Sequence, residues 1–286
     1  MSPAAVGLVV LSAFAHVYWN FVLKRSGAPV LCAWWIMAAG AAAGAPLALW
    51  LHWPPRVPMA GLLCALGTGA LYALYFWLIG LSYRSEDLSR AYPIARGVAP
   101  LVTALWGVLF FHERPTALGW TGIMAIVLGV AALAMPPTAA ARIPLTGVAA
   151  AVATGLCTSA YSALDKLGVQ LIPPALYIVL TFTVGAAVLG AGAMLGSRCR
   201  WRDFAAERHR LGPSLYAAAL ASMGGYLLVL NVLRTEPVSY VVPVRSVSVL
   251  LSVLAGSQLL GEARGWSRTA AAAVVLLGIA AIARAG

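Results

Sequence analysis

The feature that most constrains this chain is a series of apolar segments, each long enough to cross a lipid bilayer. Proline, glycine and charged residues divide the 286 residues into ten such segments. A helix needs about 20 apolar residues to cross a hydrocarbon layer that is about 30 Å thick. The sequence therefore predicts an all-α polytopic membrane protein with ten transmembrane helices. The predicted spans are 3–23, 29–51, 58–82, 88–111, 116–135, 144–165, 174–196, 212–233, 238–260 and 266–284.

The composition supports this class and argues against several functions. Hydrophobic residues make up 62% of the chain and charged residues only 9%, whereas soluble proteins carry about 25% charged residues. The net charge of +11 belongs to the loops between predicted spans, so we expect no nucleic-acid binding. The four cysteines are widely spaced, and no metal-binding or ATP-binding motif is present. We therefore expect no cofactor, no metal and no enzyme activity, with the lipid bilayer as the surroundings.

Two segments that lie about half a chain apart carry the same order of polar residues. One runs from Ser89 to Glu113 and the other from Ser239 to Glu262. From the arginine onward, each matching residue of the second segment follows its counterpart by 149 positions. The pairs are Arg96 with Arg245, Thr103 with Ser252, Gly107 with Gly256, and Glu113 with Glu262. A pattern repeated at half the chain length indicates a duplicated structure.

The first and sixth predicted spans also match each other. Each has a polar residue at every fourth position, which forms a polar ridge on an otherwise apolar helix. The ridges are Ser12, His16, Asn20 and Lys24 in the first span, and Thr154, Thr158, Ser162 and Lys166 in the sixth. Each half then holds five spans, so the second half must enter the membrane from the opposite side. We predict two inverted five-helix repeats, residues 1–137 and 138–286, with a substrate site between them near the midplane.

The two arginines of the repeated segments lie deep in their predicted spans. Arg96 lies about 12 Å from the start of its helix, at 1.5 Å per residue, and an arginine at this depth needs water or a partner. The arginines either tie helices together or face a substrate path, and we favour the second interpretation for at least one of them. Pro93 and Pro243 should kink these helices, which is tolerated next to a cavity.

Glycines on the same helix faces suggest how the helices move. Gly107 and Gly256 would allow neighbouring helices to approach closely. We therefore predict that they act in gating, together with the kinks at Pro93 and Pro243. A leucine at either glycine is expected to block transport and to leave membrane insertion intact.

These features resemble the drug/metabolite transporter superfamily, specifically transporters made of two EamA-type domains. The resemblance covers essentially the whole chain. It implies a basket of ten helices, a cavity lined mainly by spans one, three, four, six, eight and nine, and export or exchange of metabolites. It rests on the two Pro-to-Arg-to-Glu segments, on Trp19-Asn20…Lys24 ending the first span, and on Asp165-Lys166-Leu167-Gly168 ending the sixth.

The ionisable residues near the middle of the membrane indicate the charge of the substrate. Related small multidrug transporters keep a glutamate midway along the first span, whereas this chain has His16 near that depth. Every Asp and Glu is expected near a span end. This pattern favours an anionic substrate group, because arginine holds a carboxylate or phosphate through two parallel hydrogen bonds. The predicted substrate-binding residues are His16, Trp19, Asn20, Tyr75, Tyr92, Arg96, Thr158, Tyr161, Tyr226 and Arg245.

We therefore predict a secondary transporter that exports or exchanges a small anionic or zwitterionic metabolite, such as an amino acid, by alternating access. If protons drive transport, His16 is the predicted carrier, because Arg96 and Arg245 stay protonated. The alternatives are an exporter of hydrophobic or cationic drug-like compounds, a non-transporting membrane partner or sensor, and an intramembrane enzyme. We expect a monomer or weak dimer in a bacterial inner membrane.

Two indications disagree about the side of the membrane on which the termini lie. Five lysines and arginines of predicted loops and span ends share the side of the termini, and twelve lie on the other side. The positive-inside rule then favours termini outside the cell. The family resemblance implies cytoplasmic termini, which we favour because much of the imbalance comes from the segment 197–211. The five on the side of the termini are Arg56, Arg114, Lys166, Arg234 and Arg284.

Overall fold

The computed structural model describes residues 1–82, 86–134, 145–196, 199–251 and 266–285, with side chains outside 80–96, 134–147 and 252–268. Within these ranges the chain forms helices and no strand. The helices of the first half are α1 (Pro3–Arg25), α2 (Pro29–Leu51), α3 (Met59–Ser82), α4 (Glu86–Phe111) and α5 (Ala117–Ala134). Those of the second half are α6 (Leu145–Leu171), α7 (Pro174–Gly196), α8 (Trp201–Leu211), α9 (Pro213–Thr235), α10 (Val238–Arg245) and α12 (Trp266–Ala285).

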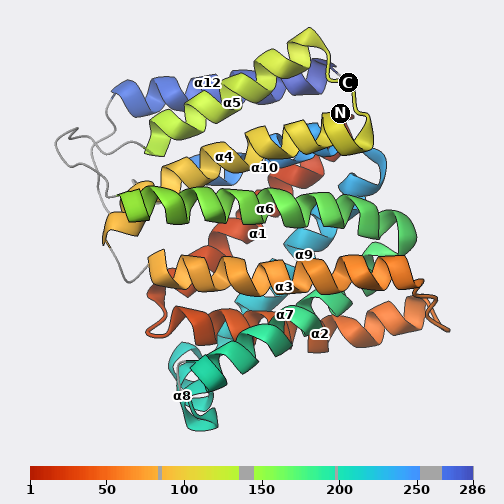
Figure 1. Ribbon diagram of the computed structural model, residues 1–286, viewed down its shortest axis with the longest axis vertical. Helices are drawn as coiled ribbons and strands as arrows, with labels where there is room; N and C mark the ends of the chain where they lie inside the picture. The colour runs from red at the N-terminus through yellow and green to blue at the C-terminus, as the bar shows by residue number, and fades with distance from the viewer. Residues whose placement is uncertain (83–85, 135–144, 197–198, 252–265, 286) are drawn as a thin grey trace.

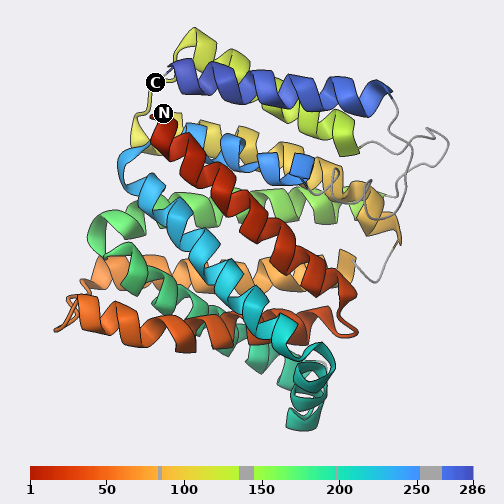
Figure 2. The ribbon, with the colours of Figure 1, turned by 180° about the vertical axis from the view of Figure 1, so that it is seen from behind.

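The long helices lie side by side in two layers. In Figure 1, α3, α4 and α6 form the front layer, and Figure 2 shows α1, α9 and α10 in the layer behind it. The pair α5 and α12 covers one edge, and the pair α2 and α7 covers the other. Both termini lie at one end of the bundle, whereas α8 lies at the opposite end. The centre of the molecule is therefore enclosed by helices from both halves of the chain.

Several helices of each half pack on helices of the other half, in matching pairs. Helix α1 packs on α9 as α6 packs on α3, and α2 packs on α9 as α7 packs on α3. Two further pairs, α2 with α7 and α5 with α12, each join a helix to its own counterpart. This pattern fits a duplicated bundle in which each half completes the packing of the other.

Within the residues that the structure describes, five helices are long and apolar enough to cross a membrane, judged by length and composition: α1, α2, α3, α7 and α9. Shorter apolar helical stretches occur at Gly97–Phe111, Ala117–Leu133, Val238–Leu251 and Thr269–Ala285. The structure is therefore that of an all-helical polytopic membrane protein. The full number of ten spans stays a prediction.

The prediction that the sixth span ends at residue 165 is wrong. Helix α6 continues to Leu171, six residues further. The Asp165 side chain is fully buried, and the Nζ atom of Lys166 donates hydrogen bonds to the carbonyls of Leu233 (2.8 Å) and Glu236 (2.9 Å). Since other helices bury Asp165 and bind Lys166, their charges do not end the helix.

The segment 197–211, expected as a basic loop, contains the amphipathic helix α8. The Asp203 side chain caps its start by accepting the backbone N–H of Arg200 at 2.6 Å. Phe204 is fully buried, and its carbonyl accepts a hydrogen bond from the indole N–H of Trp35 at 2.8 Å. Gly212 ends the helix with φ of 55°, a conformation that glycine adopts without strain. The apolar side of α8 is thus packed on α2 while its arginines lie at one end of the molecule.

The predicted ninth span is interrupted at Ser246. Helix α10 ends at Arg245, and the helical backbone resumes as far as Leu251. The Ser246 N–H bonds to the Pro243 carbonyl, and the Val249 N–H bonds to the Ser246 carbonyl, both at 2.9 Å. The interruption lies three residues after Pro243, which is buried inside α10. It leaves the Arg245 side chain at the end of a short helix in the middle of the bundle.

Candidate functional site

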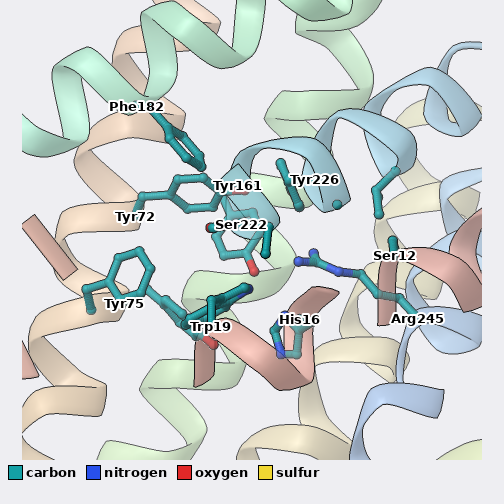
Figure 3. A pocket seen from close by; sticks show the side chains of 14 residues that line it. Ser12, His16, Trp19, Tyr72, Tyr75, Tyr161, Phe182, Ser222, Tyr226 and Arg245 are labelled. Atoms are coloured by element: carbon teal, nitrogen blue, oxygen red, sulfur yellow. The ribbon is translucent and has the colours of Figure 1, made fainter. Parts of the chain in front are cut away.

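Two adjoining cavities lie between the helix layers. Their volumes are about 30 and 40 Å³, and His16, Tyr75, Tyr161 and Arg245 line both. The lining residues come from α1, α3, α4, α6, α7, α9 and α10, so both halves of the chain contribute. Figure 3 shows the Arg245 guanidinium reaching between Tyr226 and Ser222 on one side and His16 and Trp19 on the other.

The larger part of the wall is aromatic. Tyr72 has its ring centroid 4.6 Å from that of Tyr161 and 5.5 Å from that of Tyr226. On the opposite wall, the rings of His16 and Trp19 lie 4.8 Å apart. All three pairs are edge-to-face contacts, which are favourable because the ring edge is positive and the ring face negative. The wall is therefore apolar on its surface but carries several hydroxyl groups.

Arg245 supplies the positive charge of the cavity. Its Cζ atom lies 4.5 Å from the centroid of the Tyr226 ring, a cation–π contact. The residue is half-buried. Among the side chains that the structure describes, no carboxylate lies within 4 Å of the guanidinium as an ion pair. Arginine presents several N–H donors in one plane, so the guanidinium can still bind a planar anionic group.

Helical spacing brings these side chains to the cavity. Tyr72 and Tyr75 are three residues apart on α3, and Ser222 and Tyr226 are four apart on α9, so each pair shares one helix face. The sequence indicated Tyr72 only as an aromatic residue that could line the apolar part of the site, and Ser222 was not among the predicted binding residues. The same spacing that singled out the ridge containing His16 could have identified both.

Seven of the predicted binding residues line the cavities. Asn20 does not, because its side-chain N–H instead donates to the His16 carbonyl at 2.8 Å. Tyr92, Arg96, Pro93 and Gly256 lie outside the residues whose side chains the structure describes. The seven are His16, Trp19, Tyr75, Thr158, Tyr161, Tyr226 and Arg245.

The hydroxyl ridge of α6 is largely satisfied within its own helix. The hydroxyl of Thr154 donates to the Ala150 carbonyl (2.8 Å), and that of Thr158 donates to the Thr154 carbonyl (2.9 Å). Ser162 donates to the Thr158 carbonyl in the same way, at 2.8 Å. Thr154 and Thr158 line the second cavity with the oxygen lone pairs still able to accept hydrogen bonds.

Gly107 faces a helix contact and does not line either cavity. It is buried, and a Cβ atom there would collide with the Glu113 carboxylate and lie 3.0 Å from the Cβ of Ser239. The sequence predicted that this glycine allows a neighbouring helix to approach closely. The structure adds that the approaching group is a carboxylate from the loop after α4.

The expectation that every acid lies near a span end is wrong for Asp165. Its side chain is fully buried within α6, and its Oδ2 atom accepts a hydrogen bond from the Tyr226 hydroxyl. Sequence reasoning missed it because α6 was predicted to end there. Among the described residues, no group of three or more His, Cys, Asp or Glu side chains could hold a metal ion.

Comparisons with known proteins agree with this architecture. The chain is 27% identical over 220 residues to the "Uncharacterized transporter YwfM" of Bacillus subtilis (strain 168), covering 74% of this chain and 70% of that protein. A stretch of 73 residues is 40% identical to the "Probable glucose uptake protein GlcU" of Bacillus anthracis, covering 24% of this chain and 23% of that protein. A stretch of 62 residues is 36% identical to the "Multidrug resistance protein EbrA" of Bacillus atrophaeus, covering 22% of this chain and 59% of that protein.

A solved crystal structure shares the fold over nearly its full length. It superposes with a TM-score of 0.72 at 18% identity and covers 99% of both chains. The sequence model of the EamA-like transporter family matches residues 3–135 and again residues 145–284. The two matches coincide with the two halves that exchange contacts, and the chain belongs to the EamA-like transporter family.

Proposed function

We propose that the protein is a secondary transporter that exports or exchanges a small anionic or zwitterionic metabolite, such as an amino acid. The chain is a multi-pass protein of the bacterial inner membrane, and family membership indicates transport. The observation that carries the proposal is the Arg245 guanidinium inside an aromatic cavity. A carboxylate binds a guanidinium through two hydrogen bonds, and the Tyr and Trp rings suit an apolar part of the same molecule.

The cavity volumes support transport by alternating access between two inverted repeats. Cavities of about 30 and 40 Å³ hold only a few water molecules, whereas ligand pockets usually measure about 300 Å³ or more. A substrate therefore requires helices to separate on one side of the cavity. Since α1, α3, α6, α9 and α10 all line it, such a movement changes contacts between the halves.

Counterflow in proteoliposomes tests the substrate class. The panel contains benzoate, L-phenylalanine, L-glutamate, glucose and tetraphenylphosphonium. We expect exchange of a carboxylate-bearing member. Arg245→Gln should raise the half-saturation concentration of that substrate roughly 10-fold or more, because a charged hydrogen-bonded pair is lost. The control is Arg284→Gln, at an exposed arginine near the end of α12.

The alternative is an exporter of hydrophobic or cationic compounds. The aromatic wall favours it, since rings also bind cations, but Arg245 repels a cation placed among the same rings. Exchange of tetraphenylphosphonium that is insensitive to Arg245→Gln supports this alternative and contradicts the proposal. Exchange of glucose alone would also contradict it.

A further inference from the structure

A buried carboxyl group, that of Asp165, lies next to the cavity wall but lines neither cavity. Asp165 is fully buried, six residues before the end of α6, which places it about 9 Å from that end at 1.5 Å per residue. An ionisable side chain inside a membrane-spanning helix is costly to keep and is usually functional. The tertiary structure, and not the sequence pattern, brings this acid into the centre.

Three hydroxyl groups from three helices surround the carboxyl group. The Tyr226 hydroxyl donates a hydrogen bond to Oδ2. The hydroxyls of Thr68 and Tyr177, bonded to each other at 2.9 Å, also approach the carboxyl group. The Oδ1 atom is buried and accepts no hydrogen bond of ordinary geometry from the residues that the structure describes. The Oδ1 atom can therefore bind a proton, because no neighbouring group that the structure describes already donates a hydrogen bond to it.

Only one of the described groups that face Asp165 carries a full charge. Tyrosine and cysteine are neutral near physiological pH, which leaves the Arg245 guanidinium as the positive charge that interacts with the acid. The titratable groups facing it are Cys64 and Tyr72 on α3, Tyr177 on α7, Tyr226 on α9 and Arg245 on α10.

Tyr226 connects this acid to the cavity. Its hydroxyl bonds to Asp165, whereas its ring lines the cavity and lies 4.5 Å from the Cζ atom of Arg245. Figure 3 shows Tyr226 next to the guanidinium at the cavity wall. A hydroxyl group both donates and accepts hydrogen bonds. It can therefore pass a proton between cavity water and the carboxylate.

We propose that Asp165 is the proton-binding site of the transport cycle and takes up its proton when an anion binds Arg245. The proposal rests on the function proposed above. A hydronium ion in the cavity gives a proton to the Tyr226 oxygen while the Tyr226 hydroxyl gives its own proton to Oδ2. The net change is one proton moved from water to the carboxylate, and Tyr226 is unchanged.

The charges fix the sign of the coupling. An ionised Asp165 is stabilised by the positive charge of Arg245. A bound anion neutralises that charge, so protonation of Asp165 accompanies anion binding. One proton then travels with each monoanion in either direction, and an exchanger of this kind carries no net charge.

The first test needs no substrate. Infrared difference spectra of the purified full-length protein, recorded between acidic and neutral pH, report the carbonyl band of protonated carboxyl groups. We expect one band to be lost in Asp165→Asn and retained in Asp203→Asn, a matched change on α8 that lies away from the cavity. An identical band pattern in wild type and Asp165→Asn overturns the proposal.

The second test uses proteoliposomes with an imposed pH gradient and either labelled L-glutamate or labelled L-phenylalanine, neither of which crosses the bilayer readily by itself. In Asp165→Asn the gradient-driven accumulation should fall to an inside-to-outside ratio of one, while exchange between equal pools continues. Asp165→Glu should restore accumulation. Tyr226→Phe, which keeps the ring but removes the hydroxyl group, should slow accumulation and is informative if Asp165→Asn fails to fold.

The outcomes separate this proposal from the function on which it rests. His16→Gln should lower the affinity for the substrate but keep the response of transport to pH. If His16→Gln instead loses this response while Asp165→Asn responds normally, His16 is the proton carrier and the proposal is overturned. If wild type transports no carboxylate while the Asp165 band is present, the proposed substrate class fails and the proton-binding site stands.

Discussion

The carboxylate of Glu113 accepts the backbone N–H of Ser239 at 3.0 Å, with the neighbouring N–H of Val238 at 2.7 Å. Glu113 follows α4, and Ser239 lies in the first turn of α10. An acid at a helix N-terminus satisfies N–H groups that have no partner within the helix and complements the positive end of the helix dipole. The end of the first repeated segment therefore fixes the start of the second.

Replacing Glu113 by alanine should destabilise the protein by about 1–3 kcal/mol, because two buried N–H groups lose their acceptor. Thermal unfolding in detergent measures this change. It should also weaken anion binding, since α10 ends at Arg245. An unchanged unfolding temperature would show that the contact contributes little.

Gly107→Ala should lower stability, because the added Cβ displaces the Glu113 carboxylate; overpacking of this kind costs about 1–3 kcal/mol. The expectation that leucine at this position leaves the protein otherwise intact is therefore revised: leucine should reduce abundance as well as transport. The control is Gly224→Ala on α9, where no atom lies within 4 Å of the added Cβ. Equal unfolding temperatures for the two variants would contradict the packing seen at Gly107.

The two lysines that end the matching ridges should differ in importance. Lys166 ties α6 to the end of α9 through two carbonyls, whereas Lys24 is exposed at the end of α1. Lys166→Met should destabilise by about 1.5–3 kcal/mol, the contribution of hydrogen bonds to a charged group. Lys24→Met should leave the unfolding temperature unchanged. The reverse ranking would mean that these hydrogen bonds do not stabilise the protein.

The structure also bears on the expected orientation. Lys166 binds the carbonyls of Leu233 and Glu236 at the end of α9, so it no longer counts among the loop charges on the side of the termini. Helix α8, at the opposite end, carries Arg202, Arg208 and Arg210. The positive-inside rule then predicts that α8 faces the cytoplasm.

Cysteine labelling in intact cells tests this orientation in a variant without native cysteines. Ala117→Cys, on the side of the termini, should react with an impermeant maleimide, and Ala206→Cys on α8 should not. Both positions are exposed. Labelling of Ala206→Cys alone would establish cytoplasmic termini instead.

Sequence patterns predicted the helical class, the duplication and most of the cavity, because apolar length and helical spacing are local properties. His16, Tyr161 and Arg245 were identifiable because polar residues in apolar spans stand out. Asp165 was misplaced because a charge normally marks a span end, and only contacts from α3, α7 and α9 keep it inside. The break at Ser246 was also missed, since a proline predicts a kink but not the residue at which the helix resumes.

That break at Ser246 has a mechanical consequence. Before it, α10 is held in place by Glu113 at its start, and the Tyr240 hydroxyl accepts the N–H of Thr116 at 3.2 Å. After it, the helix can tilt without disturbing those bonds, because Ser246 already interrupts the regular backbone ladder. Arg245 therefore lies at the junction between the segment that Glu113 and Thr116 hold and the helical stretch that follows as far as Leu251, so a bend at Ser246 would leave the Arg245 charge in place.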